Sequence, residues 1–381
     1  MTAYRFGRPE EEGQILDLID LVFSKTGHSH DFASLLPKVY AHPGFSSLHA
    51  VAEQDGRLTG TIAMLPLTVR MGGASLRGGY IGSVAVHSRY RGQGHMKALM
   101  DLLIDTARER AYDFLALGGQ RQRYGYWGFE LCGANLRFSI SRQNVSHALQ
   151  AETARFSFAP PADGAQWDGI KALHDRLPFR CERSRALFPD IAKSYGGALR
   201  AILDEAGGLA GYLIWTEGEI TEICLREESL LPAVLKCLLN EEKRVVVNVP
   251  GSLPERAQTL HRFAESTEIA DKEMLLPLRW EKLLQAGLEL RLEVEKMRGG
   301  SRNPLPNGER ILQIGNEGAF RLQVENGKAA VTQTKGAPDQ VWTGKQAVDS
   351  LFSPAGAWLL RDPLLRAWLP LPWGVNTADT F

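Results

Sequence analysis

The chain has few cysteines and no metal-binding pattern among them. Its four cysteines, Cys132, Cys181, Cys224 and Cys237, lie far apart among 381 residues, and no C-x-x-C pair occurs. This spacing does not match the ligand spacings of metal sites, and it favours free thiols over structural disulfides. Free thiols are typical of a reducing compartment.

The sequence also lacks net charge and long apolar runs. Lysine and arginine together number 44, as do aspartate and glutamate, so no overall field favours nucleic acid or an acidic membrane. No apolar run approaches the ~20 residues of a membrane span, and the N-terminal MTAYRFGRPEEE has no apolar signal core. We therefore expect a cytoplasmic protein with no nucleic-acid or membrane partner, in which any anion site is local.

The length of 381 residues predicts two or three domains, and a hydrophobic content of 44% is enough to form a core in each of them. In the first part, alternating and helical periodicities predict a mixed α/β domain that ends near residue 140. The expected elements are a strand at 3–7, a helix at 9–23, a hairpin at 48–71, a strand at 80–87, a helix from about 95, and a strand at 112–119.

An internal repeat follows. EQDGRLTGTIAML (53–65) aligns without gaps with DEAGGLAGYLIWT (204–216), with glycines and a leucine at matching positions. A strand, a helix and a strand are expected next, at 219–225, 230–239 and 244–250. This order favours a duplicated domain over 141–285 that lacks an Arg-x-x-Gly-x-Gly turn. In the last part of the chain, 286–381, the pattern predicts short strands, a hairpin turn at Asn326-Gly327, a helix and an apolar, proline-rich tail.

The stretch RYRGQGHMKALM (89–100) combines arginines, two glycines and the start of an amphipathic helix. The unpaired N–H groups at the start of a helix favour the binding of an anion. The alternative is a tight Gly-x-Gly turn that binds no ligand. A Walker loop is excluded because no Gly-Lys-Ser/Thr follows, and the dinucleotide fingerprint lacks its third glycine. After the next strand comes YGYWGF (124–129).

This combination resembles the GNAT superfamily of acyl-CoA N-acyltransferases. RGQGHM (91–96) fits the Arg/Gln-x-x-Gly-x-Gly/Ala turn through Gly94 and departs from it at Met96, and YGYWGF fits the Tyr-x-x-x-Gly-Phe segment. Over the whole chain, the sequence resembles the Eis family within that superfamily. The resemblance implies tandem mixed α/β domains: a GNAT domain (1–140), a degenerate GNAT-like domain (141–285) and a sterol-carrier-like α/β domain (286–381).

The resemblance also implies a cofactor site for acetyl-CoA, with no metal. The backbone of Val84, Ala85 and Val86 would pair with the pantetheine, whose amides mimic a neighbouring strand. The turn would hold the pyrophosphate through residues Arg91, Gly92, Gln93, Gly94, His95, Met96 and Lys97. Its N–H groups and the helix dipole stabilise negative charge, and the glycines permit close approach. We expect the His95 side chain itself to face solvent.

Two groups are expected to move protons. Tyr124 matches the general-acid tyrosine of the superfamily, because a phenol can protonate a thiolate leaving group. Tyr126 and Trp127 are expected to be buried aromatics. In the Eis family the C-terminal carboxylate accepts the proton of the amine, which assigns that role to Phe381; the alternative is that Phe381 is only a hydrophobic anchor.

These features predict an acetyl-CoA-dependent N-acetyltransferase. It would act on a primary amine of a small polycationic molecule, aminoglycoside- or polyamine-like, or on a lysine. A non-catalytic CoA-binding sensor is one alternative. An apolar-ligand carrier is another, with a tunnel lined by Trp358, Leu359, Leu360, Leu364, Leu365 and Trp368, although these side chains also fit an ordinary core.

Specificity for the acceptor is expected to lie in the first helix and the loop after it, KTGHSHDFASLL (25–36), in the second domain and at the tail. In that loop, Asp31 is a candidate for attracting a cationic amine. An exposed loop aspartate is, however, usually only solvated. The resemblance further implies a homo-oligomer, a hexamer in that family.

Overall fold

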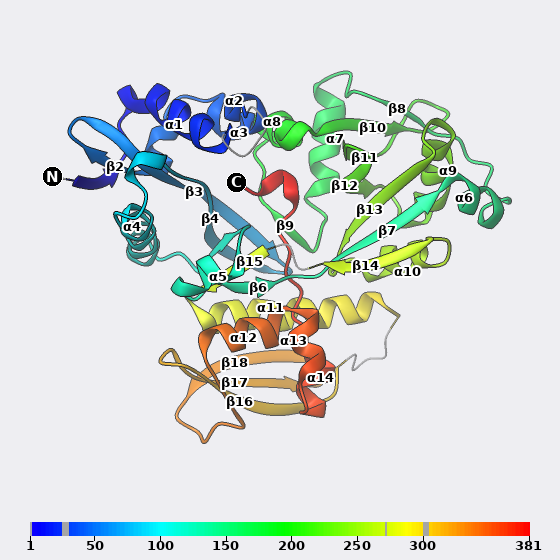
Figure 1. The fold of residues 1–381 in the computed structure, drawn as a ribbon. Coiled ribbons are helices and arrows are strands. Elements are labelled where there is room, and N and C mark those ends of the chain that lie inside the picture. Colours follow the sequence, from blue (N-terminus) through cyan, green and yellow to red (C-terminus); the bar gives the residue numbers. More distant parts are fainter. Residues whose placement is uncertain (1, 25–29, 271–272, 300–304) are drawn as a thin grey trace.

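The computed structural model describes residues 2–24, 30–270, 273–299 and 305–381. In this part of the chain, strands form three β-sheets, and helices pack against each of them (Figure 1). We call each sheet with its helices the first, second and third unit. The predicted mixed α/β class is confirmed.

The first sheet joins strands that are far apart in the sequence. Its spatial order is β1 (Thr2–Phe6), β2 (His49–Gln54), β3 (Arg57–Met71), β4 (Ala74–Val86), β5 (Phe114–Leu117), β15 (Glu273–Pro277) and β6 (Glu130–Cys132), and β9 (Phe179–Cys181) pairs with β3. β4 and β5 run parallel, whereas the other neighbours are antiparallel. Their pairing ends at Ile81 and Leu117, so β4 continues beyond β5 and the sheet splits there.

Helices cover both faces of the first sheet. α1 (Glu12–Ser24) buries Ile15 and Ile19 in a cluster with Val51, and α4 (His95–Glu109) packs on a second cluster. Alternate strand residues point to opposite faces of a sheet. Val51 therefore packs in the cluster of α1, whereas its neighbours Ala50 and Ala52 pack in the cluster of α4. The shorter helices are η1 (Pro9–Glu11), α2 (Phe32–Leu35), α3 (Pro37–Tyr40), η2 (Phe45–Leu48), η3 (Ser88–Tyr90), α5 (Arg121–Tyr124) and η4 (Gly125–Trp127).

The second sheet repeats the order of the first. From one edge to the other it contains β8 (Ser157–Ala159), β10 (Ala198–Leu203), β11 (Leu209–Thr216), β12 (Glu219–Leu225), β13 (Arg244–Pro250), β7 (Asn135–Ser141) and β14 (Ser266–Ala270). β12 and β13 run parallel, as β4 and β5 do. Its helices are α6 (Arg142–Ala148), α7 (Gly164–His174), α8 (Phe188–Lys193), η5 (Ser194–Gly196), η6 (Glu228–Leu230), α9 (Leu231–Glu241) and α10 (Pro254–His261).

The two units exchange one strand each. In the first sheet the place beside β5 is taken by β15, which follows the second unit in the chain; in the second sheet the place beside β13 is taken by β7, which follows the first unit. The aligned segments 53–65 and 204–216 lie on the β2–β3 and β10–β11 hairpins, whose turn glycines Gly56 and Gly207 have φ of 74° and 79°. The shared strand order supports a duplication.

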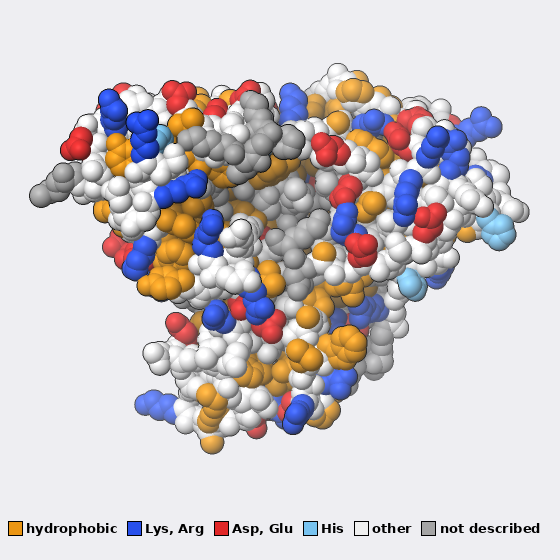
Figure 2. All heavy atoms as spheres, in the orientation of Figure 1, with side chains coloured by type: hydrophobic (Ala, Val, Ile, Leu, Met, Phe, Trp, Pro, Cys, Tyr) orange, Lys and Arg blue, Asp and Glu red, His pale blue; other side chains and the backbone are white. Residues whose placement is uncertain are grey.

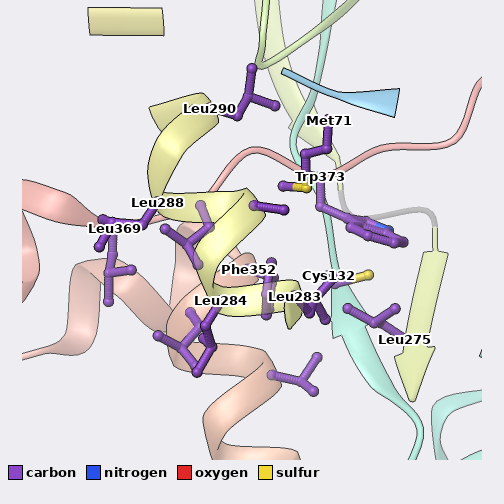
Figure 3. Packing of buried hydrophobic residues seen from close by; sticks show 14 of the residues in the cluster. Met71, Cys132, Leu275, Leu283, Leu284, Leu288, Leu290, Phe352, Leu369 and Trp373 are labelled. Carbon is purple, nitrogen blue, oxygen red and sulfur yellow. The ribbon is translucent and has the colours of Figure 1, made fainter. Parts of the chain in front are cut away.

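The third unit contains a four-stranded sheet and lies against the first unit. Its elements are α11 (Trp280–Met297), β16 (Gly308–Ile314), β17 (Gly318–Glu325), β18 (Lys328–Thr334), β19 (Gln340–Trp342), α12 (Gly344–Phe352), α13 (Pro354–Leu359) and α14 (Pro363–Trp368). One hydrophobic cluster runs through α11: Leu283 and Leu288 share it with Met71 of β3 and Phe352 of α12 (Figure 3).

The predicted domain boundaries near 140 and 285 stay a prediction. The sheets are not built from contiguous ranges, because β9 and β15 come from within 141–285 and pair in the first sheet. α11 begins at Trp280, slightly before the predicted start of the last domain. An exchange between similar strands leaves no mark on local periodicity, so the sequence did not indicate it.

The tail, which we define as residues 374–381, returns from the third unit to the space between the first two (Figure 1). It contains one short turn, η7 (Thr377–Asp379), and Figure 1 places the C-terminus between α3, α8 and β9. No helix of the described residues combines the length and the apolar character that crossing a membrane requires. All four cysteines are described, and no disulfide joins them.

Candidate active site

The split between β4 and β5 exposes one edge of β4. Val86 and Ala85 pair with Gly60 and Thr61 of β3, but on the edge that faces β5 no strand of the described residues pairs beyond Ile81. Ser83, at φ 47°, marks a break in the regular strand geometry at this point. The predicted residues Val84, Ala85 and Val86 therefore lie where an extended amide-containing chain could pair with β4.

The glycine turn forms an open cradle at the start of α4. Gly92 and Gly94 have φ of 78° and 81°, a region that favours glycine, and no atom lies within 4 Å of where their Cβ atoms would be. Gly94 is the N-cap of α4, so the first N–H groups of the helix face this turn. Residues 91–94 are exposed. The turn therefore combines open space with the N-terminus of a helix, which is the arrangement that an anion requires.

The side chains around the turn differ in their surroundings. Arg91 is exposed, and its Nε donates to the carbonyl of Val86 at 3.5 Å. Lys97 pairs with Asp101 across one helical turn at 2.6 Å, and Gln93 is exposed. Met96, the departure from the small-residue position, is half-buried against the hydrophobic cluster below α4.

The expectation that His95 faces solvent is wrong. Its side chain is 3% exposed, because the first turn of α4 packs against β1, and its Nδ1 lies 3.0 Å from the Tyr4 hydroxyl. Nε2 is buried and has no hydrogen-bond partner among the described residues. His95 can therefore reach the turn only through its backbone N–H.

Tyr124 is buried at the end of α5, at the split. Its ring lies so close to Gly119 that a Cβ there would approach Cε2 of the ring to 2.4 Å, so the glycine makes room for the phenol. Burial raises the pKa of Tyr124 above its ordinary value of 10.0, and the charge of Arg123 opposes this shift. The phenol is therefore neutral at rest and can donate a proton.

Two neighbouring expectations need correction. Tyr126 is not buried: it is 69% exposed and lies over the ammonium of Lys97, 5.9 Å from the ring centroid. Trp127 is half-buried and donates from Nε1 to Asp101 at 2.8 Å. In the YGYWGF segment only the first tyrosine therefore belongs to the site.

Asp31, the candidate for attracting a cationic amine, is an exposed helix cap. Its side chain accepts from the Ser34 N–H at 3.1 Å and caps α2. The preceding part of the predicted specificity loop, 25–29, lies outside the described residues.

Phe381 lies in the split. A Cβ at Gly82, the residue after the last β4–β5 pair, would meet the Phe381 ring at 2.2 Å. The ring also packs edge-on against Tyr40 and His49, with centroids 6.1 and 6.3 Å away. The structure thus brings Phe381 to the strand that carries Val84.

Of the predicted site residues, Val84, Tyr124 and Phe381 line one cavity of about 720 Å³ between the first two units, and residues 91–97 lie outside its lining. Tyr80, Val84 and Tyr124 from the first unit contribute to its wall, as do Asn248 from the second and Phe381 from the tail. A cavity of this size fits a small molecule together with part of a cofactor. No group of three or more metal-binding side chains occurs among the described residues.

Glu273 in the cavity wall was not predicted from the sequence. It lies on the exchanged strand β15 and is 6% exposed; its Oε2 accepts from Trp373 Nε1 at 2.6 Å and from Val375 N at 3.4 Å. Its Oε1 is buried without a partner among the described residues. Burial raises the pKa of Glu273 to about 8. The local sequence EMLLP (273–277) does not indicate this role, because the residues around Glu273 are brought to it by the strand exchange.

Comparison with known proteins identifies the first unit. Residues 3–132 match the family model of the acetyltransferase (GNAT) domain. The chain contains a GNAT acetyltransferase domain. Within this GNAT domain lie the split strand, the glycine turn and Tyr124. No curated protein matches the chain in sequence.

Solved structures match the GNAT domain together with the rest of the chain. A GCN5-related N-acetyltransferase from Anabaena variabilis has a TM-score of 0.70 at 18% identity, and a probable N-acyltransferase from Enterococcus faecalis 0.68 at 16%. Eis1 from Mycobacterium abscessus has 0.64 at 14%. In all three, the match covers 100% of both chains. The Eis-like fold expected from the sequence is confirmed.

Glu273→Gln should change how stability depends on pH. The folded-state pKa of about 8 exceeds the ordinary value of 4.5, so the folded chain keeps a proton that the unfolded chain releases. The stability that Glu273 contributes is thus fully present below pH 4.5 and is lost as the pH rises to 8. Glutamine does not titrate. Between about pH 5 and pH 8, the variant should lose less unfolding free energy than wild type, by a few kcal/mol.

Urea unfolding at both pH values measures this difference. Equal losses in the two proteins would mean that Glu273 is ionised in the folded chain.

Proposed function

We propose that the protein is an acetyl-CoA-dependent N-acetyltransferase that acts on a primary amine. The acceptor would be a small polycationic molecule, aminoglycoside- or polyamine-like, or a lysine side chain. The observation that carries the proposal is the convergence of the split β4 edge, Tyr124 and Phe381 on one cavity. The match of residues 3–132 to the GNAT domain supports it.

The cofactor would lie along the split and end at the glycine turn. The free edge of Val84, Ala85 and Val86 would pair with the amides of the pantetheine. The N–H groups from Gly92 to Lys97 would hold the pyrophosphate, and the exposed Arg91 and Lys97 add positive charge. When bound, acetyl-CoA supplies an acetyl group on a thioester.

The chain's own residues would handle two protons. An alkyl amine with a pKa near 10.4 is almost fully protonated at neutral pH, so a base must first remove a proton. We assign this role to the carboxylate of Phe381, acting directly or through a water. Tyr124 would then protonate the departing thiolate, since its phenol is buried and neutral.

Two alternatives have less support. A CoA-binding sensor would need the glycine turn but not the Tyr124 phenol at the split. A turnover screen distinguishes such a sensor from an enzyme. The side chains that the sequence suggested for a carrier tunnel in the third unit do not line a common tunnel. Trp358 and Leu359 are 79% and 81% exposed, whereas Leu365 and Trp368 are buried in the core. By resemblance, we further propose a cytoplasmic homo-oligomer with a sterol-carrier-like third unit.

Gly94→Glu should prevent acetyl-CoA from binding. The new side chain would stand in the open cradle, and its carboxylate would repel the pyrophosphate. Gly207→Glu is the matched control, because Gly207 has φ 79° and equally open surroundings but lies on the β10–β11 turn. Calorimetric titration should show binding in the control and none in Gly94→Glu. Unchanged affinity in a folded Gly94→Glu protein would move the cofactor site elsewhere.

Tyr124→Phe tests the chemistry. The variant should bind acetyl-CoA normally and lose about 10²–10⁴-fold in kcat, as expected when a general acid is removed. Tyr126→Phe should stay at the wild-type rate, since that ring faces solvent. Turnover is followed as free thiol released with aminoglycosides, polyamines and lysine peptides. If wild type binds acetyl-CoA but acetylates none of these amines, the sensor hypothesis gains.

A further inference from the structure

The second unit has a split at the position that corresponds to the cofactor split. In the first sheet the parallel pairing ends at Ile81 of β4, and in the second it ends at Ile220 of β12. The residues that follow are Gly82 and Thr221. Gly82 contacts Phe381, and the Thr221 carbonyl accepts from Asn376 Nδ2 at 2.9 Å. The tail therefore reaches from one split to the other.

The second split lacks what a cofactor needs. The residues between β12 and α9 read REESL (226–230) and include no glycine, and α9 begins with a proline in its first turn. Two of the β12 carbonyls past the pairing are bonded to side chains: that of Thr221 to Asn376, and that of Ile223 to Arg256 Nη1 at 2.5 Å. This edge is occupied by the protein itself.

A buried ion-pair network holds the tail in the second split. Arg183, whose side chain is 0% exposed, donates to both Asp379 carboxylate oxygens at 2.8 Å and to both Glu222 oxygens at 2.8 Å. Glu222 lies on β12 directly after Thr221 and also accepts from the Tyr212 hydroxyl at 2.6 Å. Losing one partner of such a network leaves a buried charge uncompensated, which is strongly unfavourable.

The first unit adds a second anchor. Lys38 of α3 is 8% exposed, and its Nζ donates to the carbonyl of Ala378 at 2.6 Å and also to that of Thr380. These bonds flank Asp379. They fix the backbone direction of the two residues before Phe381, so the place of Phe381 in the first split depends on both anchors.

We propose that the second unit is a receptor for the tail, whose split holds residues 376–379 where the first unit would hold its cofactor. Arg183 and Lys38 are positioning residues that set where Phe381 lies beside Gly82. Retention of the tail needs no enzymatic activity. The consequence for turnover rests on the proposed function.

Trimming by a carboxypeptidase tests retention of the tail. A terminus held in the split is a poor substrate, so the wild-type 381-residue chain should lose Phe381 slowly, as measured by intact mass. Asp379→Asn should be trimmed about 10-fold faster or more, because Arg183 loses a charged partner. Asp379→Lys should be trimmed faster still, since it places a third cation beside Arg183 and Lys38.

Glu228→Gln is the matched control. It removes the charged partner of another buried arginine in the second unit, Arg256, without touching the tail. It should be trimmed at the wild-type rate, as measured well below the melting temperature of each protein. Equal trimming of wild type and both Asp379 variants would overturn the proposal.

Kinetics separates positioning from general stability. Asp379→Asn and Lys38→Met should lower kcat by about 10- to 100-fold and leave the KM for acetyl-CoA near the wild-type value, because neither change touches residues 84–97. If the variants are trimmed fast but keep the wild-type kcat, the second unit still holds the tail, but Arg183 and Lys38 do not position Phe381 for turnover. If wild type turns over no amine, the proposed function fails while the trimming result stands.

Discussion

The buried guanidinium of Arg183 joins three separate parts of the chain. Arg183 follows β9, which pairs with the first sheet; Glu222 belongs to the second sheet, and Asp379 belongs to the tail. Arg183 holds the pKa of Glu222 well below its ordinary value, so this carboxylate stays charged although it is buried. Removing any one member would leave the others charged in a medium that solvates charge poorly. The place of the tail, and with it the shape of the cavity, depends on this network.

The exchange of strands ties the first two units together. β15 and β7 each complete the sheet of the other unit, so the two splits face a common space instead of opening separately to solvent. α11 follows β15 directly and buries Leu283 and Leu288 against both the first and the third unit (Figure 3). In Figure 2 the face toward the viewer is hollowed where the first two units meet, above the third. The third unit thus serves as a fixed base from which the tail returns.

The parts of the site that could be predicted from the sequence are the local ones. The glycine conformations before α4 and the turns at Gly56 and Asn326 follow from neighbouring residues, and Tyr124 was proposed from the resemblance of the short segment YGYWGF; their roles in the site stay predictions. The errors at His95 and Tyr126 concern burial, which distant partners decide; the partner of His95 is Tyr4, 91 residues away. Glu273, Arg183 and Lys38 were missed for the same reason. Their partners Trp373, Asp379 and Ala378 lie 100, 196 and 340 residues away, and no periodicity or spacing records such a contact.

The central claim is that a carboxylate delivered by the tail acts beside Tyr124. It is tested most directly by appending a few residues after Phe381, which converts the carboxylate into a neutral amide and leaves residues 84–97 unchanged. The measurement is turnover of one amine, with acetyl-CoA affinity determined on the same preparation and an N-terminally extended protein as the control. The account predicts normal affinity in both proteins, and loss of turnover only in the C-terminally extended one. Turnover of that protein at the control rate would contradict it.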